Sequence, residues 1–208
     1  MKKPRAAEAT SLVAEELSDS TWKDFEALFE RNGGVWGGCW CTFYHASRGS
    51  PWSAGQGNKE KKRQLMQGGR AHGVIVTDGG VPVGWCQFGP KEELPRIDGW
   101  RGYVAPADPS LWRITCFFVD RGHRHVGVAR VALAAALKSM EKSGVELVEA
   151  YPVEVGRKRT SASLLWSGTP SLFESFGFKR VQKLGKSTWV MQRRLKPDRD
   201  GGMAGSPD

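Results

Sequence analysis

The sequence predicts an α+β fold in a single domain. Runs rich in β-branched and aromatic residues, which favour strands, occur in the middle and near the end of the chain. Segments whose apolar residues recur at helical spacing precede and separate these runs. The chain has 208 residues, of which 39% are hydrophobic, so it is long enough for one well-buried domain and short for two. We place that domain at residues 11–196 and expect residues 1–10 and 197–208 to be disordered.

Composition and charge narrow the class of protein. The formal net charge is +9 and the isoelectric point is about 9.6. A basic surface suits nucleic acid, a polyanionic cofactor or an acidic substrate, but runs of charge most often mark solvated faces, so nucleic acid is not the favoured partner. No apolar run approaches the length of about 18 residues that crosses a membrane, and the N-terminus lacks an apolar segment. We therefore expect no membrane span, no secretory signal and a cytoplasmic location.

The first third of the chain contains two predicted helices with an aromatic segment between them. After a capping Ser20 or Thr21, four apolar residues repeat at helical spacing: Trp22, Phe25, Leu28 and Phe29. Residues Gly34–His45 are rich in glycine and aromatic residues, which indicates a loop or bent edge strand that either lines a pocket or plugs the core. Asn58 is expected to cap a polar helix over Lys59–Gln67, with its lysines in solvent.

A β-hairpin and a long loop follow these helices. The segments Gly73–Thr77 and Val81–Phe88 are rich in strand-forming residues and flank Asp78-Gly79-Gly80, which is a strong hairpin signal. Residues Gly89–Ser110 include four prolines and form a loop. Loops of this length in compact domains are usually functional or mobile, so we expect this one to border the site.

The central stretch of the chain reads as a strand, a basic turn and a helix. Residues Arg113–Val119 have strand composition, and a helical apolar stripe starts at Val126 and stops at Ser143-Gly144. The turn between them, Asp120–Gly127, is glycine-containing and basic. The first turn of a helix has unpaired N–H groups and the positive end of the helix dipole, so this arrangement predicts an anion site. The uncharged run Val131–Leu137 indicates a helix packed under a sheet.

The C-terminal part is expected to complete the sheet. Residues Val145–Val155 predict a strand interrupted at Pro152, and Arg157–Thr169 form a basic linker. A short helix ended by glycine and a final hairpin follow, over Ser171–Phe178, Lys179–Leu184 and Ser187–Leu195.

The four cysteines predict neither a metal site nor disulfides. A single residue lies between Cys39 and Cys41, whereas the two cysteines of a zinc-binding pair normally have two to four residues between them and need a second pair of ligands. Cys86 and Cys116 stand singly within predicted strands. We expect no metal, and buried free thiols in a reducing compartment.

Two motifs in order resemble a known family. Arg124–Ala129, which follows a strand and opens a helix, fits the pattern R/Q-x-x-G-x-G/A, and Leu172–Phe178 resembles the closing LYExxGF segment. Together with the upstream hairpin, they make the chain similar to the GCN5-related N-acetyltransferases (GNAT) over about residues 10 to 195. The resemblance implies a mixed central sheet, flanked by helices, whose central strands Trp112–Val119 and Leu147–Tyr151 splay apart.

The resemblance also implies acetyl-CoA as co-substrate and the residues that hold it. The turn would surround the pyrophosphate with backbone amides, and the preceding strand would offer backbone groups to the pantetheine and the acetyl carbonyl. These predicted cofactor-binding residues are Phe117, Phe118, Val119, Arg124, His125, Val126, Gly127, Val128 and Ala129. Elementary chemistry agrees, because an extended, amide-bearing arm can pair with exposed strand backbone and a fixed N–H stabilises charge on a thioester carbonyl.

The catalytic residues do not carry over from the family. Arg113 stands where some relatives have a glutamate, and Phe173 stands where the family often uses a tyrosine as general acid. We name Glu149 and Tyr151, on the strand beside the arm, as catalytic candidates, with His45 as a further one. Each has a structural alternative: Glu149 in solvent, Tyr151 in the core with its hydroxyl at the rim, and His45 as a satisfied loop residue.

The sequence therefore predicts an acetyl-CoA-dependent N-acetyltransferase that acts on a primary amine of a small molecule or on a protein lysine. The acceptor would enter beside Gly34–His45 and Gly89–Ser110, where tryptophans favour a partly apolar amine. Two alternatives stay open: an acyl or aminoacyl transferase with another donor such as an aminoacyl-tRNA, and a non-catalytic module that senses CoA or binds nucleic acid. The sequence does not identify the acceptor molecule, and it leaves a homodimer open as the oligomeric state.

Overall fold

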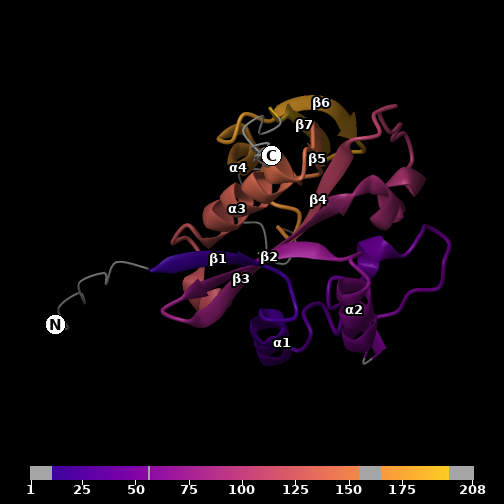
Figure 1. The fold of residues 1–208 in the computed structure, drawn as a ribbon. Helices are drawn as coiled ribbons and strands as arrows, with labels where there is room; N and C mark the ends of the chain where they lie inside the picture. The colour runs from indigo at the N-terminus through magenta and orange to yellow at the C-terminus, as the bar shows by residue number, and fades with distance from the viewer. Residues whose placement is uncertain (1–10, 56, 155–164, 197–208) are drawn as a thin grey trace, which may run out of the picture.

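The computed structural model describes residues 11–55, 57–154 and 165–196. Its centre is one open, mixed sheet in the order β1-β2-β3-β4-β5-β7-β6 (Figure 1). The strands are β1 (Leu12–Glu16), β2 (His72–Asp78), β3 (Val81–Pro90), β4 (Leu111–Val119), β5 (Leu147–Ala150), β6 (Lys179–Leu184) and β7 (Thr188–Arg194). Within this part of the chain, β4 and β5 are the parallel pair and the other neighbours run antiparallel. The predicted α+β fold is confirmed.

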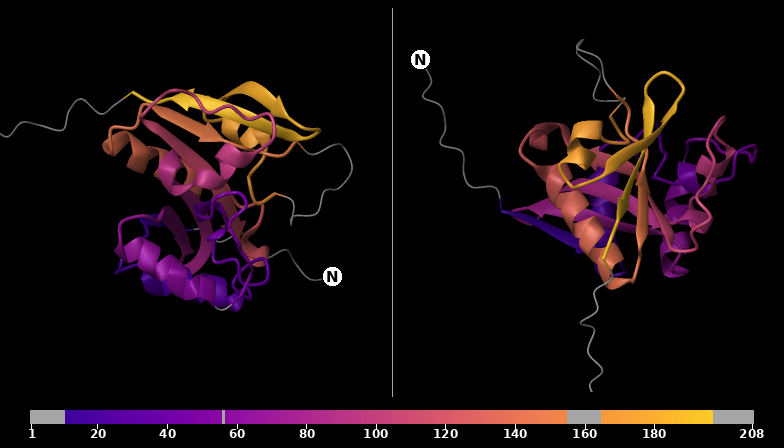
Figure 2. Two further views of the ribbon diagram at one scale, coloured as in Figure 1. Left: turned by 90° about the vertical axis from the view of Figure 1, so that its right-hand side faces the viewer. Right: turned by 90° about the horizontal axis from the view of Figure 1, so that it is seen from above.

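Helices cover both faces of the sheet. The long helix α3 (Val128–Lys142) lies across one face and contacts β1 to β4, and α4 (Pro170–Glu174) packs against β7. On the other face, α1 (Trp22–Arg31) packs against β3, with α2 (Gly57–Gln67) beside it. Among the described residues, four short 3₁₀ helices lie in the connections: η1 (Phe43–His45), η2 (Lys91–Glu93), η3 (Pro95–Gly99) and η4 (Arg121–His123). Figure 2 shows the N-terminal elements and the C-terminal strands in opposite halves of the molecule.

Three apolar cores result from this layering. The α3 core contains Val74, Ile114, Leu133 and Phe173 among others, and the α1 core contains Phe25, Phe29, Trp40 and Trp85 among others. The third core lies under the long loop and is rich in aromatic residues; we call it the loop core. Its members include Tyr44, Leu94, Ile97, Tyr103, Tyr151 and Val190, with Trp100 and Trp166 partly buried against them. In the uncharged run Val131–Leu137 the residues Ala132, Leu133, Ala136 and Leu137 are buried against the sheet, as the composition predicts, whereas Ala134 is exposed.

Two glycines of the hairpin allow close packing on the two faces of the sheet. A Cβ built on Gly73 would stand 2.1 Å from the ring of Trp85, and one built on Gly84 would stand 2.2 Å from Cγ1 of Val128. Real Cβ atoms do not approach other atoms this closely, so both positions need glycine. The second contact fixes the distance between β3 and the first residue of α3.

Most predicted elements are present, and the differences have local causes. The edge strand β1 was not predicted, because Leu12–Glu16 lack a clear alternation and have only two half-buried residues among exposed ones. Helix α3 begins at Val128 rather than Val126, because His125 and Gly127 have φ angles of 67° and 95°, which a helix cannot accommodate. Strand β5 stops at Ala150, well before Val155.

The long loop, the chain ends and the linker were predicted to lack regular strands. The loop Gly89–Ser110 carries η2 and η3 and buries Leu94 and Ile97, so it is folded rather than open. The predicted disordered ends and most of the linker Arg157–Thr169 lie outside the described residues. Among the helices that the structure describes, none has the length and apolar character to cross a membrane.

Candidate active site

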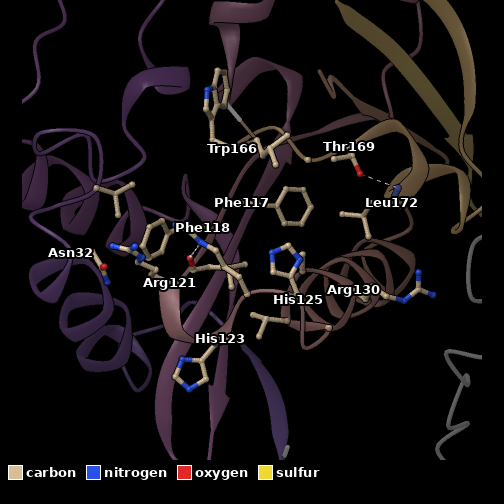
Figure 3. A pocket seen from close by; sticks show the side chains of 18 of the residues that line it. Asn32, Phe117, Phe118, Arg121, His123, His125, Arg130, Trp166, Thr169 and Leu172 are labelled. Atoms are coloured by element: carbon tan, nitrogen blue, oxygen red, sulfur yellow. Dashed lines mark hydrogen bonds between the residues drawn. The ribbon is translucent and has the colours of Figure 1, made fainter. Parts of the chain in front are cut away.

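A cavity of about 920 Å³ opens where β4 and β5 diverge. The parallel pairing of the two strands ends at Ile114 and Ala150, whereas β4 continues to Val119. The wall is formed by the end of β4, the basic turn, the first turn of α3, the segment before α4 and part of the aromatic segment Gly34–His45 (Figure 3). Lining side chains include Trp36, Phe117, Val119, His125, Ala129, Trp166 and Leu172. The predicted splay of the central strands is present.

The turn after β4 places basic side chains and helix N–H groups on one wall of this cavity. Gly127, at φ 95°, precedes α3 and also lines the cavity. Arg121, His123, Arg124 and His125 come from the turn and Arg130 from the helix. Because the first N–H groups of a helix lack intrahelical partners, this wall is suited to a bound anion. Five of the six residues of the predicted pyrophosphate motif, all except Val126, line it.

A salt bridge compensates the carboxylate at the start of this turn. Asp120 accepts from Arg31 at 2.8 Å and also caps η4 by accepting from the N–H of Gly122. Burial disfavours its ionised form, yet the Arg31 guanidinium holds the pKa of Asp120 below its ordinary value. The carboxylate therefore stays ionised and paired with Arg31. The basic side chains of the turn that line the cavity thus give this wall a net positive charge.

The three predicted residues of β4 differ in where their backbone groups point. Phe117 donates its N–H to the carbonyl of Trp166 at 2.6 Å, and the carbonyl of Val119 accepts from Nε of Arg124 at 3.4 Å. Alternate residues of a strand direct their backbone groups to opposite sides. The backbone of Phe118 therefore faces β3, where it pairs with Trp85, although its side chain reaches the cavity wall. Phe117 and Val119 are the β4 residues whose backbone faces the cleft.

Glu149 lies in a closed hydrogen-bond network rather than in solvent. Its side chain is fully buried, and Oε2 accepts from the hydroxyls of Tyr103 at 2.6 Å and Tyr151 at 2.7 Å. Its Oε1 accepts from Nε2 of Gln192 at 2.7 Å. The interpretation of Glu149 as a solvent-facing residue is therefore wrong. Neither Glu149 nor Tyr151 is among the residues that line the cavity.

Tyr151 is a core residue whose hydroxyl is buried with the ring. Burial raises the pKa of Tyr151 well above its ordinary value, and burial together with the bond to Glu149 raises that of Tyr103 to about 12. Both hydroxyls therefore stay protonated and donate to the carboxylate. The expectation of a hydroxyl at the rim is wrong, since Tyr151 is 1% exposed.

Arg113 organises the long loop over this network. Its guanidinium is buried, forms an ion pair with Asp98, and donates to the carbonyl of Leu94 at 2.9 Å and to the hydroxyl of Tyr103 at 3.2 Å. Burial opposes its charge, but the pair with Asp98 raises the pKa of Arg113 above its ordinary value. Arg113, in the position where some relatives have glutamate, is thus a permanent cation that holds η2 and η3 against β4.

A second hydrogen-bonded chain of polar side chains, which sequence reasoning missed, links η1 and α2 to β3 and β4. Nδ1 of His45 lies 3.0 Å from the carbonyl of Glu93, and Nε2 lies 3.3 Å from Nζ of Lys62. Lys62 also donates to Gln87 at 3.0 Å, which donates to Thr115 of β4 at 3.2 Å. Burial lowers the pKa of Lys62 to about 8 and that of His45 well below its ordinary value.

The expected solvent exposure of the α2 lysines is wrong for Lys62. Asn58, Lys62 and Met66 are buried on one face of α2, at intervals of four residues. That spacing is the signal that could have identified the buried face, since residues four apart lie one above the other on a helix. His45 is, as its alternative interpretation holds, a satisfied loop residue, since both ring nitrogens have partners, and it does not line the cavity.

The aromatic segment Gly34–His45 combines both predicted roles. Val35, Trp40 and Cys41 belong to the α1 core, whereas Trp36 is exposed and lines the cavity with Val35. Phe173 is buried between Phe117 and Phe178 with ring centroids 5.9 and 5.1 Å apart, so no hydroxyl stands at that position. The described residues contain no group of three or more His, Cys, Asp or Glu side chains that could hold a metal ion, and the expected absence of a metal stays a prediction.

The sheet, the splayed pair β4 and β5 and the turn before α3 define the fold of a GNAT acetyltransferase. The family model for the acetyltransferase (GNAT) family matches residues 21–162, and the chain belongs to this family.

Solved structures show the same fold at low sequence identity. A putative acetyltransferase, YncA from Salmonella typhimurium with its cofactor acetyl-CoA, is 13% identical with a TM-score of 0.53, over 91% of this chain and 99% of that one. PaiA N-acetyltransferase from Thermoplasma acidophilum in complex with coenzyme A is 13% identical with a TM-score of 0.51, over 89% and 99%. An N-acetyltransferase from Staphylococcus aureus Mu50 is 14% identical with a TM-score of 0.52, over 89% and 98%. No curated protein sequence matches the chain significantly.

Proposed function

We propose that this protein is an acetyl-CoA-dependent N-acetyltransferase whose acceptor is a primary amine of a small molecule or a protein lysine. The observation that carries the proposal is the cavity between β4 and β5, which joins a helix start suited to an anion to the end of β4 beyond its pairing with β5. Coenzyme A has the same two parts, a pyrophosphate and an extended amide-bearing arm.

The residues present fit such a donor. The N–H groups at the start of α3 and the basic side chains of the turn would hold the pyrophosphate. The arm would extend along β4 beside Val119 as far as Phe117, where the Phe117 N–H is already bonded to the carbonyl of Trp166. Apolar side chains on the opposite wall, such as Leu172 and Trp166, would exclude water from the arm. When bound, acetyl-CoA supplies an activated acetyl group as a thioester.

The residues that handle the proton of the amine remain a proposal. A lysine-like amine with a pKa of about 10.4 must lose a proton before it attacks. Glu149 and Tyr151 are the predicted catalytic pair, but Glu149 has protein partners on both oxygens and neither residue lines the cavity. These contacts favour a positioning role, in which the pair fixes the wall on the acceptor side.

The aromatic residues beyond Trp166 support a partly apolar amine as acceptor. Trp166 lies 5.7 Å from Tyr44, Tyr44 lies 6.4 Å from Trp100, and Trp100 lies 5.5 Å from Tyr151, measured between ring centroids. Tyr44 and Tyr151 are buried, but Trp100 and Trp166 are only partly buried, and Trp36 is exposed at the cavity wall. Such accessible aromatic faces attract cations and pack on methylene groups, and both properties suit a protonated alkyl amine as it approaches.

A charge-matched pair of variants tests the donor site. Ala129 lies in the first turn of α3 and lines the cavity, whereas Ala134 is exposed on the same helix. A glutamate near a helix N-terminus favours the helix, so Ala129→Glu is expected to fold, yet its carboxylate would repel the pyrophosphate. We expect calorimetry to show acetyl-CoA binding weakened at least about tenfold by Ala129→Glu and unchanged by Ala134→Glu.

Turnover is tested separately from binding. A thiol-release assay with acetyl-CoA is run across polyamines, amino acids, aminoglycosides and lysine peptides. Release that depends on one class of amine and is lost in Ala129→Glu supports the proposal. Binding without release on any amine contradicts the transferase activity, and the absence of binding by the wild-type protein contradicts the donor site as well.

A further inference from the structure

Two cysteines from distant parts of the chain touch inside the α1 core. The Sγ atoms of Cys41 and Cys116 lie 3.3 Å apart although 75 positions separate the residues in sequence. Cys41 belongs to the aromatic segment and Cys116 to β4, and both side chains are buried. A disulfide has an S–S distance of about 2.05 Å, so the sulfurs need to approach by only about 1.2 Å to bond.

The surroundings of the pair favour ionisation of one sulfur and not of the other. Burial disfavours a thiolate at Cys41, but the hydrogen bond with Cys116 and the positive charge of Lys62 lower the pKa of Cys41. The same hydrogen bond, together with burial, raises the pKa of Cys116 well above its ordinary value. Cys41 is thus the nucleophilic sulfur, and Cys116 keeps its proton.

We propose that Cys41 and Cys116 form a redox modification site, which a peroxide converts into a disulfide that fixes the aromatic segment Gly34–His45 to β4. The Cys41 thiolate attacks one oxygen of hydrogen peroxide, the O–O bond breaks, and hydroxide leaves and becomes water with the proton that Cys41 has lost. The sulfur of Cys116 then attacks the sulfenic sulfur of Cys41. A second water leaves with the Cys116 proton, so two thiols lose two electrons and one peroxide becomes two waters.

This disulfide would act on the wall of the cavity. Val35 and Trp36, from the same aromatic segment, line the cavity together with Phe118, which is two residues after Cys116. Trp40 and Cys41 have φ angles of 48° and 49°, a conformation that such residues rarely adopt. A covalent bond from Cys41 to β4 would therefore hold a segment whose backbone is otherwise under strain.

Peptide mapping of the full chain tests the proposal without any substitution. The protein is treated with hydrogen peroxide, alkylated and digested without reduction. We expect the free thiols to fall from four to two, one cross-linked peptide pair containing Cys41 and Cys116, and recovery of four thiols with dithiothreitol. Four retained thiols, a cross-link through Cys39, or irreversible sulfinic acid at Cys41 would overturn the proposal.

Variants provide matched controls. Cys86 is also buried but lies in the α3 core on the opposite face of the sheet, so Cys86→Ser is expected to form the same cross-link as the wild type. Cys116→Ser is expected to form none. Hydrogen exchange of residues 34–45 should slow on oxidation of the wild type and remain unchanged in Cys116→Ser. Equal exchange before and after cross-linking would overturn the claim that the bond fixes the segment.

The role of Lys62 has its own control. Lys62→Met keeps the apolar stem and removes the charge near Cys41, whereas Lys61→Met removes an exposed charge from the same helix. We expect the rate of cross-linking with peroxide to fall about tenfold in Lys62→Met and to stay unchanged in Lys61→Met. Equal rates in the two variants would show that the ammonium group does not activate Cys41.

Discussion

The backbone N–H of Phe117 donates to the carbonyl of Trp166 at 2.6 Å, beyond the last residue pair that joins β4 to β5. Through this bond, the segment before α4 occupies the position beside β4 that β5 has left. The side chain of Trp166 packs into the loop core while its residue lines the cavity. Trp166 therefore separates the proposed donor site from the aromatic residues on the acceptor side.

Replacement of Trp166 by alanine is expected to weaken acetyl-CoA binding about tenfold. Loss of the indole removes part of the apolar wall, and a contact worth about 1.4 kcal/mol corresponds to a factor of ten in affinity. Calorimetry measures the change. Trp189→Ala is the control, because Trp189 is partly buried but does not line the cavity. Equal affinities in the two variants would contradict the placement of the donor beside Trp166.

Glu149→Gln separates a positioning role from a catalytic one. The amide cannot accept both tyrosine hydroxyls and the Gln192 amide as the carboxylate does, so one buried partner is lost. We expect a loss of about 2 kcal/mol in the free energy of unfolding, measured by urea denaturation, with kcat within about threefold of the wild type.

The matched control is Glu146→Gln, because Glu146 lies three residues earlier and its side chain is exposed. This variant should change neither the free energy of unfolding nor kcat. If kcat of Glu149→Gln fell by a factor of about 100 or more while its KM for the amine stayed constant, Glu149 would be the general base after all.

Local patterns in the sequence were sufficient to predict the strand, the basic turn and the helix start that form one wall of the cavity. Helical periodicity and the glycine of the turn located the start of α3 to within two residues, because both are set by neighbours in the chain. The polar interior was not predictable in this way. Arg113 meets Asp98 and Glu149 meets Tyr103 only after the long loop folds over β5, and no periodicity encodes that approach. Lys62 lies between these two cases. The four-residue spacing of Asn58, Lys62 and Met66 could have indicated a buried helix face, but the charge of Lys62 favoured an exposed position.

Lys62 makes the free energy of unfolding depend on alkaline pH. Burial lowers its pKa from 10.5 to about 8, so between these values the unfolded chain binds a proton that the folded chain releases. The stabilisation that the folded chain gains when Lys62 is deprotonated is complete above pH 10.5 and is lost as pH falls to about 8. The shift of about 2.5 units corresponds to at most about 3 kcal/mol.

The dependence is measured as a difference between variants, so that the titration of all other groups cancels. From pH 8 to 10, we expect the stability of the wild type to rise relative to that of Lys62→Met, in urea denaturation at each pH. Lys61→Met should run parallel to the wild type, since Lys61 is exposed. A constant difference between wild type and Lys62→Met across this range would mean that Lys62 keeps an ordinary pKa in the folded protein.

The contact between Gly84 and Val128 ties the position of α3 to the hairpin. An alanine Cβ at residue 84 would stand 2.2 Å from Cγ1 of Val128, so the helix start or the strand must move. We expect Gly84→Ala to cost about 1–3 kcal/mol in the free energy of unfolding and to weaken acetyl-CoA binding, because α3 carries the anion-binding turn. Gly57→Ala is the control, since a Cβ there meets no atom within 4 Å and the residue does not line the cavity.

A double-mutant cycle then identifies the cause. Val128→Ala alone removes two buried methyl groups and is expected to cost about 1–2 kcal/mol. In Gly84→Ala/Val128→Ala the new methyl group takes the space of the lost Cγ1, so the two costs should not add, with a coupling of about 1 kcal/mol or more. Acetyl-CoA binding should recover in the double variant relative to Gly84→Ala. Additive losses in stability, with binding still weak, would show that Gly84→Ala acts through Val76, 3.2 Å from the same Cβ position, and not through the start of α3.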